Sequence, residues 1–392
     1  MKVLQINSVC GIRSTGRICT DIADVLTDEG HECKIAYGRE SVPENYRKYA
    51  VRIGTELDVN FHVLISRIFD KSGFGSRKAT EKFIDWVKDY NPDIIHLHNI
   101  HGYYINIEVL FEYLKSCDKK IIWTLHDCWA FTGHCAYFDF AGCNLWKNGN
   151  CGKCPQKNKY PASLLFDNSE NNYFLKKKLF TETENITLIT PSRWLAEITE
   201  ESYLGKHKIK VIPNGISTDN FKSTPSDIRK LYNIADKKIV LGVAGAWDTR
   251  KGMNDIVRLS AMLDDNYQIV MIGLSDKQIK SLPANIIAIT RTNDTTELAQ
   301  WYTAANVFIN PTYEDNYPTT NLEAQACGTP VITYRTGGSV ESVPADNIVD
   351  KGNIDGLYEK ILREDLKVEM LDFSKTAMLN AYKEIYLSAA YS

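Results

Sequence analysis

Short apolar runs alternate with amphipathic stretches along most of the chain, which is the pattern of an α/β protein. In the first half, buried strands are predicted at 2–6, 33–37, 92–98, 120–125 and 186–189. A second series is predicted at 238–244, 268–272, 286–289, 307–309 and 331–332. Strands that alternate with helices form parallel sheets, so we predict two Rossmann-like domains that face an interdomain cleft.

The domain boundary is predicted near the middle of the chain. At 392 residues the chain is too long for one ordinary hydrophobic core. The segment Ile209–Ile216 closes the first series of strands, and the next strand begins at Lys238. We therefore expect one domain over residues 1–214, a second over residues 215–372, and a last helix over residues 373–392.

The stretch from Phe308 to Glu341 carries most of the predicted chemistry of the second domain. Its strand ends at Asn310, an acidic loop follows, and Pro318 marks the first turn of a short helix that ends at Gly328. Ligands of parallel sheets bind at the carboxyl ends of the strands. This loop is therefore a predicted binding site.

The loop suits a ligand with phosphate and hydroxyl groups. Backbone N–H groups at a helix N-terminus favour phosphate, and here they belong to Tyr317, Thr319, Thr320 and Asn321. The carboxylates of Asp315 and Glu323 flank that position and can accept hydrogen bonds from sugar hydroxyls. From the residues alone, a solvated acidic loop followed by an unrelated glutamate is the alternative interpretation.

A carboxylate, seven residues, a glutamate and then Ala-x-Ala-Cys-Gly-Thr-Pro-Val together resemble the donor-binding signature of retaining glycosyltransferases of family 4. Counting back from Glu323 places the first carboxylate on Asp315, and Glu314, one residue earlier, is the alternative. The resemblance implies that the first acid contacts the transferred sugar. It also implies that Glu323 binds the nucleoside ribose and that the amides between them hold the pyrophosphate.

This resemblance covers nearly the whole chain and implies a GT-B fold. The implied reaction is transfer of a sugar from a UDP- or GDP-sugar to an acceptor hydroxyl, with retention at the anomeric carbon. The acceptor would be a glycan or lipid-linked glycan in capsule, O-antigen or exopolysaccharide assembly, and the last helix would cross back onto the first domain. No Asp-x-Asp motif lies at the donor position, so no catalytic divalent ion is expected. Another GT-B enzyme, an epimerase or phosphorylase, is the rival interpretation.

Arg250 and Lys251 lie between a strand and a helix, where they form a predicted phosphate site. Lys251 matches the Lys-Gly pair of the family. The family arginine stands several residues earlier, at a position that is Ala246 in this sequence, so Arg250 is expected to substitute for it.

In the first domain, His126 follows the strand at 120–125, and Trp-Thr-Leu-His-Asp resembles the family segment that carries the active-site histidine. His126 is therefore the predicted catalytic histidine, since its pKa lies near neutrality. His98 ends another strand, and Thr15 and Gly16 lie in a turn at a helix start. These three are predicted to meet phosphate or acceptor, with structural loop and cap roles as alternatives.

An insertion at 133–156 contains Cys135, Cys143, Cys151 and Cys154 with the spacing C-x7-C-x7-C-x2-C. The last pair has the spacing of tetrahedral zinc sites, and a structural zinc would stabilise a knob too small for its own core. Unrelated thiols and a redox-active Cys151/Cys154 pair are the alternatives. A zinc-knuckle binding module is therefore a rival function from a different class.

The charge balance and hydropathy narrow the possible partners. A net charge of −3 gives no overall basic surface, so nucleic acid is not an expected partner. No signal peptide or bilayer-spanning apolar stretch is visible, and we expect a cytoplasmic protein. Aromatic residues beside Lys176, Lys177 and Lys178 in the segment Ser163–Phe180 predict peripheral contact with the inner membrane face; a solvated helix face is the alternative.

Overall fold

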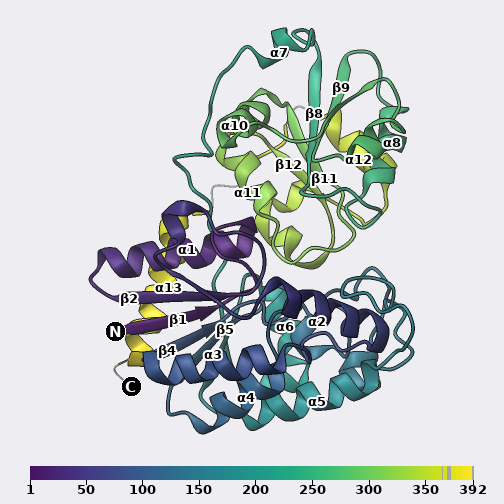
Figure 1. The fold of residues 1–392 in the computed structure, drawn as a ribbon. Helices are drawn as coiled ribbons and strands as arrows, with labels where there is room; N and C mark the ends of the chain where they lie inside the picture. The colour runs from purple at the N-terminus through teal and green to yellow at the C-terminus, as the bar shows by residue number, and fades with distance from the viewer. Residues whose placement is uncertain (364, 369–371, 391–392) are drawn as a thin grey trace. The chain divides into compact units, whose positions relative to one another are not determined.

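The computed structural model describes residues 1–363, 365–368 and 372–390, and the chain divides into two compact units (Figure 1). Unit 1 comprises Met1–Ile212 together with the chain from Leu379 onwards, and unit 2 comprises Pro213–Met378. Parts of two predicted segments, residues 369–371 of the second domain and 391–392 of the last helix, lie outside the described residues, as does residue 364.

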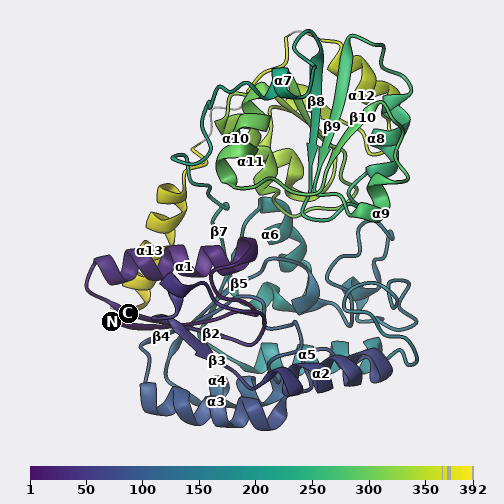
Figure 2. The same ribbon diagram turned by 45° about the horizontal axis from the view of Figure 1, so that its top comes forward.

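Unit 1 is built on a seven-stranded parallel sheet with the strand order β3-β2-β1-β4-β5-β6-β7, and helices cover both of its faces (Figures 1 and 2). Its strands are β1 Lys2–Ile6, β2 Glu32–Tyr37, β3 Ala50–Arg52, β4 Ile94–Leu97, β5 Lys120–Thr124, β6 Ile186–Thr190 and β7 Lys208–Val211. Its α-helices are α1 Arg13–Asp28, α2 Glu56–Phe69, α3 Arg77–Tyr90, α4 Ile107–Ser116, α5 Ser169–Glu182 and α6 Arg193–Glu200.

Unit 2 has a six-stranded parallel sheet with the order β10-β9-β8-β11-β12-β13. Its strands are β8 Lys238–Val243, β9 Tyr267–Ile272, β10 Ile286–Ile289, β11 Val307–Asn310, β12 Val331–Tyr334 and β13 Ile348–Val349. Its helices are α7 Ile228–Leu231, α8 Met253–Ser260, α9 Asp276–Ile279, α10 Thr295–Ala304, α11 Thr319–Ala326, α12 Ile354–Ile361 and the 3-10 helix η5 Gly337–Ser342.

The strands are apolar on both sides because each sheet is covered on both faces. Every residue of β4, β11 and β12 is buried, as expected for parallel strands between two layers of helices. In unit 2, one apolar cluster joins the sheet to α10 and α11, and a second joins it to α8 and α12. The first of these cores fixes the position of α11, whose first turn carries the predicted donor-binding groups.

Strand order reverses once in each sheet, between β1 and β4 in unit 1 and between β8 and β11 in unit 2. Loops that leave such a pair of strands diverge and open a crevice at their carboxyl ends. The loops after β8 and β11 carry Lys251 and Asp315, and the loop after β4 carries His98. The predicted site residues therefore follow the positions where this fold binds ligands.

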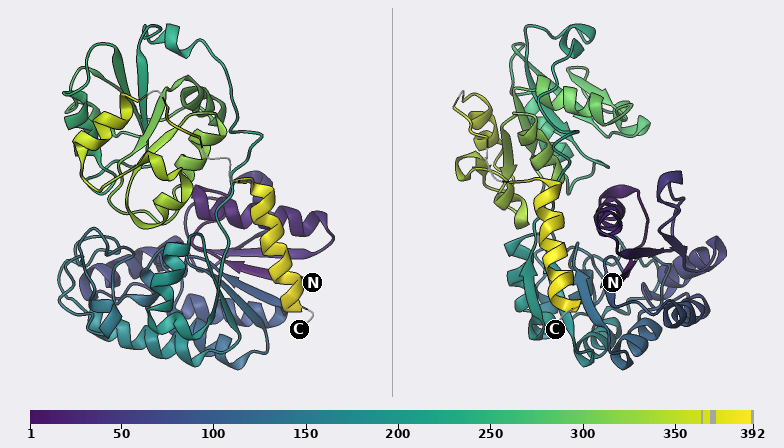
Figure 3. Two further views of the ribbon diagram at one scale, coloured as in Figure 1. Left: turned by 180° about the vertical axis from the view of Figure 1, so that it is seen from behind. Right: turned by 90° about the vertical axis from the view of Figure 1, so that its left-hand side faces the viewer.

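The last helix, α13 (Lys375–Ala390), is drawn in yellow beside the strands of unit 1 in Figure 3. From Leu379 onwards it belongs to unit 1. Tyr386 Oη lies 2.6 Å from His96 Nδ1 on β4, and Tyr382 Oη lies 3.0 Å from Thr124 Oγ1 on β5. Buried hydrogen bonds thus join the end of the chain to the centre of the first sheet.

Candidate functional site

In unit 2, the loops after β8 and β11 are joined by polar contacts. Lys251 Nζ forms an ion pair with Asp315 Oδ2, and both side chains are largely buried. Arg250 Nη1 donates to the backbone carbonyl of Glu314 at 3.0 Å. The two cations and the acidic loop are separate in the sequence, and the structure brings them together.

Two glycines allow the loops after β8 and β12 to approach the loop after β11 closely. Gly252 has φ +76°, and a Cβ atom there would lie 2.0 Å from the carbonyl oxygen of Pro311. Gly337 has φ +48°, and a Cβ atom there would lie 1.9 Å from the carbonyl oxygen of Asp315. Any side chain would push the loops apart, so glycine is required at both positions.

The loop that carries Asp315 leads into the first turn of α11. Pro318 occupies the N-cap, and within the described residues no side chain caps the helix. Asn321 behaves differently from its neighbours Thr319 and Thr320, because its own N–H donates to the Pro318 carbonyl at 3.2 Å. Its buried side chain also bonds to Asn310, Ser339 and Ser342. Asn321 therefore holds the start of α11 against β11 and η5.

Glu323 lies one turn further along α11, where Tyr302 Oη donates to its Oε2 at 3.0 Å. Tyr302 is fully buried on α10, and burial, followed by the nearby Glu323 carboxylate, raises the pKa of its hydroxyl well above the usual value. Sequence analysis missed Tyr302, since a tyrosine on an amphipathic helix reads as core. Of the two candidate first acids, Glu314 is buried and Asp315 is partly exposed.

In unit 1, two predicted histidines come together at the ends of adjacent strands. β4 pairs with β5, His98 follows the first and His126 follows the second. His98 Nδ1 lies 3.1 Å from His126 Nε2, and the two rings are nearly parallel. Burial lowers the pKa of His126 to about 4 and that of His98 well below its usual value. Both imidazoles are therefore neutral at pH 7.

Gln5 fixes the direction of these hydrogen bonds. Its Nε2 donates to the backbone carbonyl of Cys19 at 2.8 Å, so its Oε1 faces His98 Nε2, at 3.1 Å. A carbonyl oxygen only accepts, and neutral His98 must therefore donate from Nε2 and accept at Nδ1. It follows that His126 donates from Nε2. Sequence analysis missed Gln5, which lies on β1, far from both histidines in the chain.

A second pair supports the same loops. His101 Nε2 lies 2.9 Å from Asp127 Oδ2, and His101 Nδ1 lies 3.1 Å from Tyr160 Oη. Asp127 also accepts the Trp129 N–H at 2.9 Å. Asp127, the residue after His126, is thus held in place by hydrogen bonds.

Thr15 and Gly16 lie inside helix α1, which begins at Arg13. The sequence had suggested a turn at the start of this helix. Thr15 Oγ1 accepts from Asn7 Nδ2 at 3.4 Å. Gly16 is buried, and a Cβ atom there would lie 3.1 Å from Val9 Cγ2. The glycine lets the first turn of α1 pack against the preceding loop.

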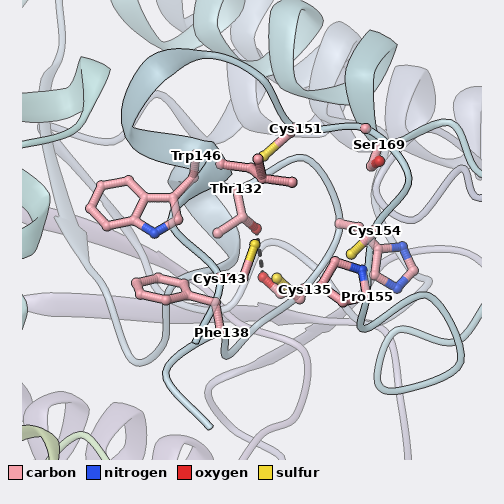
Figure 4. A pocket seen from close by; sticks show the side chains of 12 residues that line it. Thr132, Cys135, Phe138, Cys143, Trp146, Cys151, Cys154, Pro155 and Ser169 are labelled. Atoms are coloured by element: carbon pink, nitrogen blue, oxygen red, sulfur yellow. Dashed lines mark hydrogen bonds between the residues drawn. The ribbon is translucent and has the colours of Figure 1, made fainter. Parts of the chain in front are cut away.

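The four cysteines of the insertion line one small pocket of about 10 Å³, together with His134 (Figure 4). His134 Nδ1 lies 2.5 Å from Asp70 Oδ1, and its buried Nε2 has no hydrogen-bond partner among the described residues. The Cys135 thiol donates to Cys154, which lowers the pKa of Cys154. In the described part of the chain, no three Cys, His, Asp or Glu side chains are arranged as a metal site. The predicted zinc is therefore not shown.

Within the described residues, no helix is both long and apolar enough to cross a bilayer. The longest helices, α1 and α13, each have 16 residues. Their buried faces pack within the protein core.

Comparison with known proteins identifies two family matches. Residues 15–220 match the family described as Glycosyltransferase Family 4, and residues 226–364 match the family described as Glycosyl transferases group 1. Over 356 residues the chain is 25% identical to WcaC of Escherichia coli K12, described as a colanic acid biosynthesis glycosyl transferase; the match covers 87% of this chain and 85% of that protein.

A second relative is the N,N'-diacetylbacillosaminyl-diphospho-undecaprenol alpha-1,3-N-acetylgalactosaminyltransferase of Campylobacter jejuni. It is 28% identical over 214 residues, which are 50% of this chain and 56% of that protein. Among solved structures, Anabaena HepE in complex with UDP-glucose aligns with a TM-score of 0.65 at 14% identity, over 99% of this chain and 100% of that chain. The fold prediction, GT-B with two Rossmann-like domains, is confirmed. Because the match to Glycosyltransferase Family 4 spans more than half of this chain, the chain belongs to glycosyltransferase family 4.

Proposed function

We propose that this protein transfers a sugar from a UDP- or GDP-sugar to a hydroxyl group of a glycan or lipid-linked glycan, with retention at the anomeric carbon. The observation that carries the proposal is the ion pair between Lys251 and Asp315 in the loop that leads into α11, the helix that carries Glu323. The similarity to WcaC supports a role in polysaccharide assembly. The name of the Campylobacter relative supports a lipid-linked acceptor, and HepE supports a nucleotide-sugar donor.

On the donor side, Lys251, Arg250 and the amides of Tyr317, Thr319 and Thr320 would bind the diphosphate. A phosphate at this position competes with Asp315 for the Lys251 ammonium group, which lets Asp315 turn to the sugar hydroxyls. Glu323, oriented by Tyr302, would accept hydrogen bonds from the ribose. Negative charge grows on the diphosphate as the sugar leaves, and the two cations and helix amides stabilise it.

On the acceptor side, His126 would act as a neutral hydrogen-bonding group. Its Nε2 proton is committed to His98, and His98 is itself oriented by Gln5. Thr15, Gly16 and His98 would hold the neighbouring loop in position. Because His98 is neutral, it would not bind a phosphate as a cation. A role for His126 as a cation at pH 7 does not fit its lowered pKa.

The test is donor binding followed by product analysis. Thermal shift with UDP-, GDP-, ADP- and dTDP-sugars identifies the base, because a donor at 100 times its dissociation constant adds about 2.7 kcal/mol. NMR of the product then gives the anomeric configuration. Conversion of the donor without any acceptor would favour an epimerase, and an inverted product would contradict retention.

We also propose that the cysteine pocket holds a structural zinc. Its residues fit the metal: four thiols and an imidazole line one pocket, and Asp70 holds His134 Nδ1 so that Nε2 is left without a partner among the described residues. Zinc-bound histidines are oriented by a carboxylate in this way. Since no three of these groups already lie at metal-binding spacing in the described residues, binding would tighten the insertion.

A cytoplasmic location with peripheral membrane contact completes the proposal. A lipid-linked acceptor is held at a bilayer surface, and a transferase that binds that surface meets it more often. The predicted contact was the segment 163–180, of which Phe174 and Leu175 are exposed and Lys176 is buried. Nucleic acid has no place in this proposal.

A further inference from the structure

The first turn of α8 carries a buried carboxylate that the proposed function does not use. Asp255 is 6% exposed and is the acidic residue of that turn. Its Oδ2 accepts the hydroxyl group of Tyr313 at 2.7 Å and that of Tyr334 at 2.9 Å. A carboxylate is stable in a buried position only when hydrogen-bond donors replace its water, and the N-terminal end of a helix adds to that stability. The two hydroxyl groups are therefore required partners of Asp255.

Both tyrosines keep their protons and donate to Asp255. Burial, followed by the hydrogen bond to Asp255, raises the pKa of Tyr313 to about 12. Burial, followed by the charge of Asp255, raises the pKa of Tyr334 above its usual value. The two rings also meet edge to face, with their centroids 5.5 Å apart. We call this cluster of three side chains, Asp255, Tyr313 and Tyr334, the Asp255 clamp.

The Asp255 clamp joins the two chain segments that carry the Lys251–Asp315 ion pair. Asp255 comes shortly after Lys251 in the sequence, and Tyr313 comes shortly before Asp315. The backbone N–H of Tyr313 donates to the Arg250 carbonyl at 2.7 Å. One hydrogen bond between side chains and one between backbones therefore hold the loop after β11 to the segment that follows β8.

The backbones of the two tyrosines are held differently. Tyr334 lies in β12, where it pairs with Val349 of β13. β11 ends at Asn310, so Tyr313 lies in the loop beyond the sheet. Sheet pairing thus keeps Tyr334 in place without its hydroxyl group, whereas the hydroxyl group of Tyr313 helps to determine where the loop lies.

We infer that Asp255 is a positioning residue for the transfer reaction. Through the hydroxyl group of Tyr313, it fixes the loop that carries Asp315, so that Lys251 and Asp315 are held together before a donor binds. The inference rests on the proposed function, in which this ion pair belongs to the donor site. Charged groups stabilise a transition state most when they are already in place before its charge develops. A loop that changes position loses part of that stabilisation.

The test uses two variants that each remove one hydroxyl group from Asp255. Tyr313→Phe should lower kcat roughly 10-fold, because the loop that carries Asp315 is no longer fixed. Tyr334→Phe is the matched control, since it removes an equivalent hydrogen bond at a residue that the sheet holds, and it should keep the wild-type kcat. Both variants should lower the melting temperature by roughly 2–6 °C. Equal loss of kcat in the two variants, or no loss in either, would overturn the inference.

Replacement of Asp255 itself separates its position from its charge. Asp255→Asn retains an oxygen that accepts both hydroxyl groups, and its kcat should stay within about 3-fold of the wild type. Asp255→Ala removes the acceptor and should lose roughly 10-fold in kcat. If Asp255→Asn lost as much as Asp255→Ala, the charge of Asp255 would matter instead, and the positioning role would be wrong.

Amide hydrogen exchange without a donor tests the same contact independently of catalysis. In Asp255→Ala and Tyr313→Phe, the amides of residues 312–317 should exchange on the order of 10-fold faster than in the wild type, and those of β8 and β11 should not change. Unchanged exchange in this loop would contradict the positioning role. A wild type without transfer activity would contradict the proposed function instead, and the exchange rates would still decide whether Asp255 holds the loop.

Discussion

Lys251 and Asp315 neutralise each other across two loops that come from neighbouring strands. The pair keeps a cation and a carboxylate in a partly buried position before any ligand arrives. Such a pair costs little to exchange for a diphosphate, because the ligand restores the charge balance around the lysine. Under the proposed function, this pair would exchange partners with a ligand that carries both phosphate and sugar hydroxyl groups.

Replacing Lys251 with alanine should reduce turnover more than donor affinity. Under the proposed function the lysine faces phosphate charge that grows as the sugar departs, so we expect a fall in kcat on the order of 100-fold. Steady-state transfer assays check this, with Lys277→Ala, an exposed lysine in the first turn of α9, as the matched control. A loss confined to KM would mean that Lys251 only binds the donor.

Glu323→Gln should mainly weaken donor binding, by about 1–3 kcal/mol for a charged hydrogen bond to the ribose. Tyr302→Phe removes the group that orients Glu323 and should have a smaller effect in the same direction. Calorimetric titration with the donor measures both. Glu359→Gln, at an exposed position on α12, should bind normally; unchanged affinity in Glu323→Gln would place the ribose elsewhere.

Candidate residues that belong to a local motif could be predicted from the sequence. The distant residues that hold them by hydrogen bonds could not. Asp315 and Glu323 lie in one stretch whose spacing is readable. Gln5 and His98 are separated by 93 positions, and their contact exists only because β1 pairs with β4. The prediction for Asn321 shows the same limit: its helix position was readable, but its bonds to Ser339 and Ser342 were not.

At the scale of elements, α2 shows why periodicity alone does not give orientation. This helix, Glu56–Phe69, contains several apolar residues between polar ones. Leu57, Phe61, Leu64 and Phe69 nevertheless face outwards, because buried hydrogen bonds hold His62 on the inner side of the helix. The short edge strands β3 and β13 were also missed, since three and two residues carry no readable alternation.

The cysteine insertion is expected to bind about one zinc per chain, which elemental analysis of the purified protein checks. Cys154→Ser should lose the metal and lower the melting temperature, because a bound metal would stabilise the insertion beyond the packing of Phe138 and Trp146 in the core of unit 1. Cys117→Ser is the matched control, since Cys117 lies at the end of α4, outside the pocket. Metal-free protein with normal stability and activity would contradict the zinc proposal.

At the scale of the whole molecule, the histidines are distributed unevenly. All 8 lie in unit 1, and none lies in Pro213–Met378. Burial lowers the pKa of His62 to about 4 and the pKa values of His96 and His98 well below the usual value. A histidine that stays neutral in the folded state binds fewer protons than it does after unfolding. Its contribution to the stability of unit 1 is therefore present above the pKa of the unfolded state and is lost as the pH falls below that value.

Mild acid should therefore destabilise unit 1 selectively. As the pH falls from about 6.5 towards 4, each such histidine should cost about 1.4 kcal/mol of unfolding free energy per pH unit. Calorimetry at pH 7 and pH 5, with limited proteolysis to identify the unit that opens, checks this. Cleavage that begins equally in both units at pH 5 would show that the buried histidines do not set the acid response.

The chain leaves unit 1 at Ile212 and returns to it at Leu379. During synthesis on a ribosome, the first sheet therefore emerges long before Tyr382 and Tyr386, which supply hydroxyl partners to Thr124 and His96 in its interior. Unit 2 emerges in between as one continuous segment. A nascent chain thus completes its second unit while its first still lacks these hydroxyl groups, and unit 1 finishes folding only after the chain from Leu379 onwards has emerged.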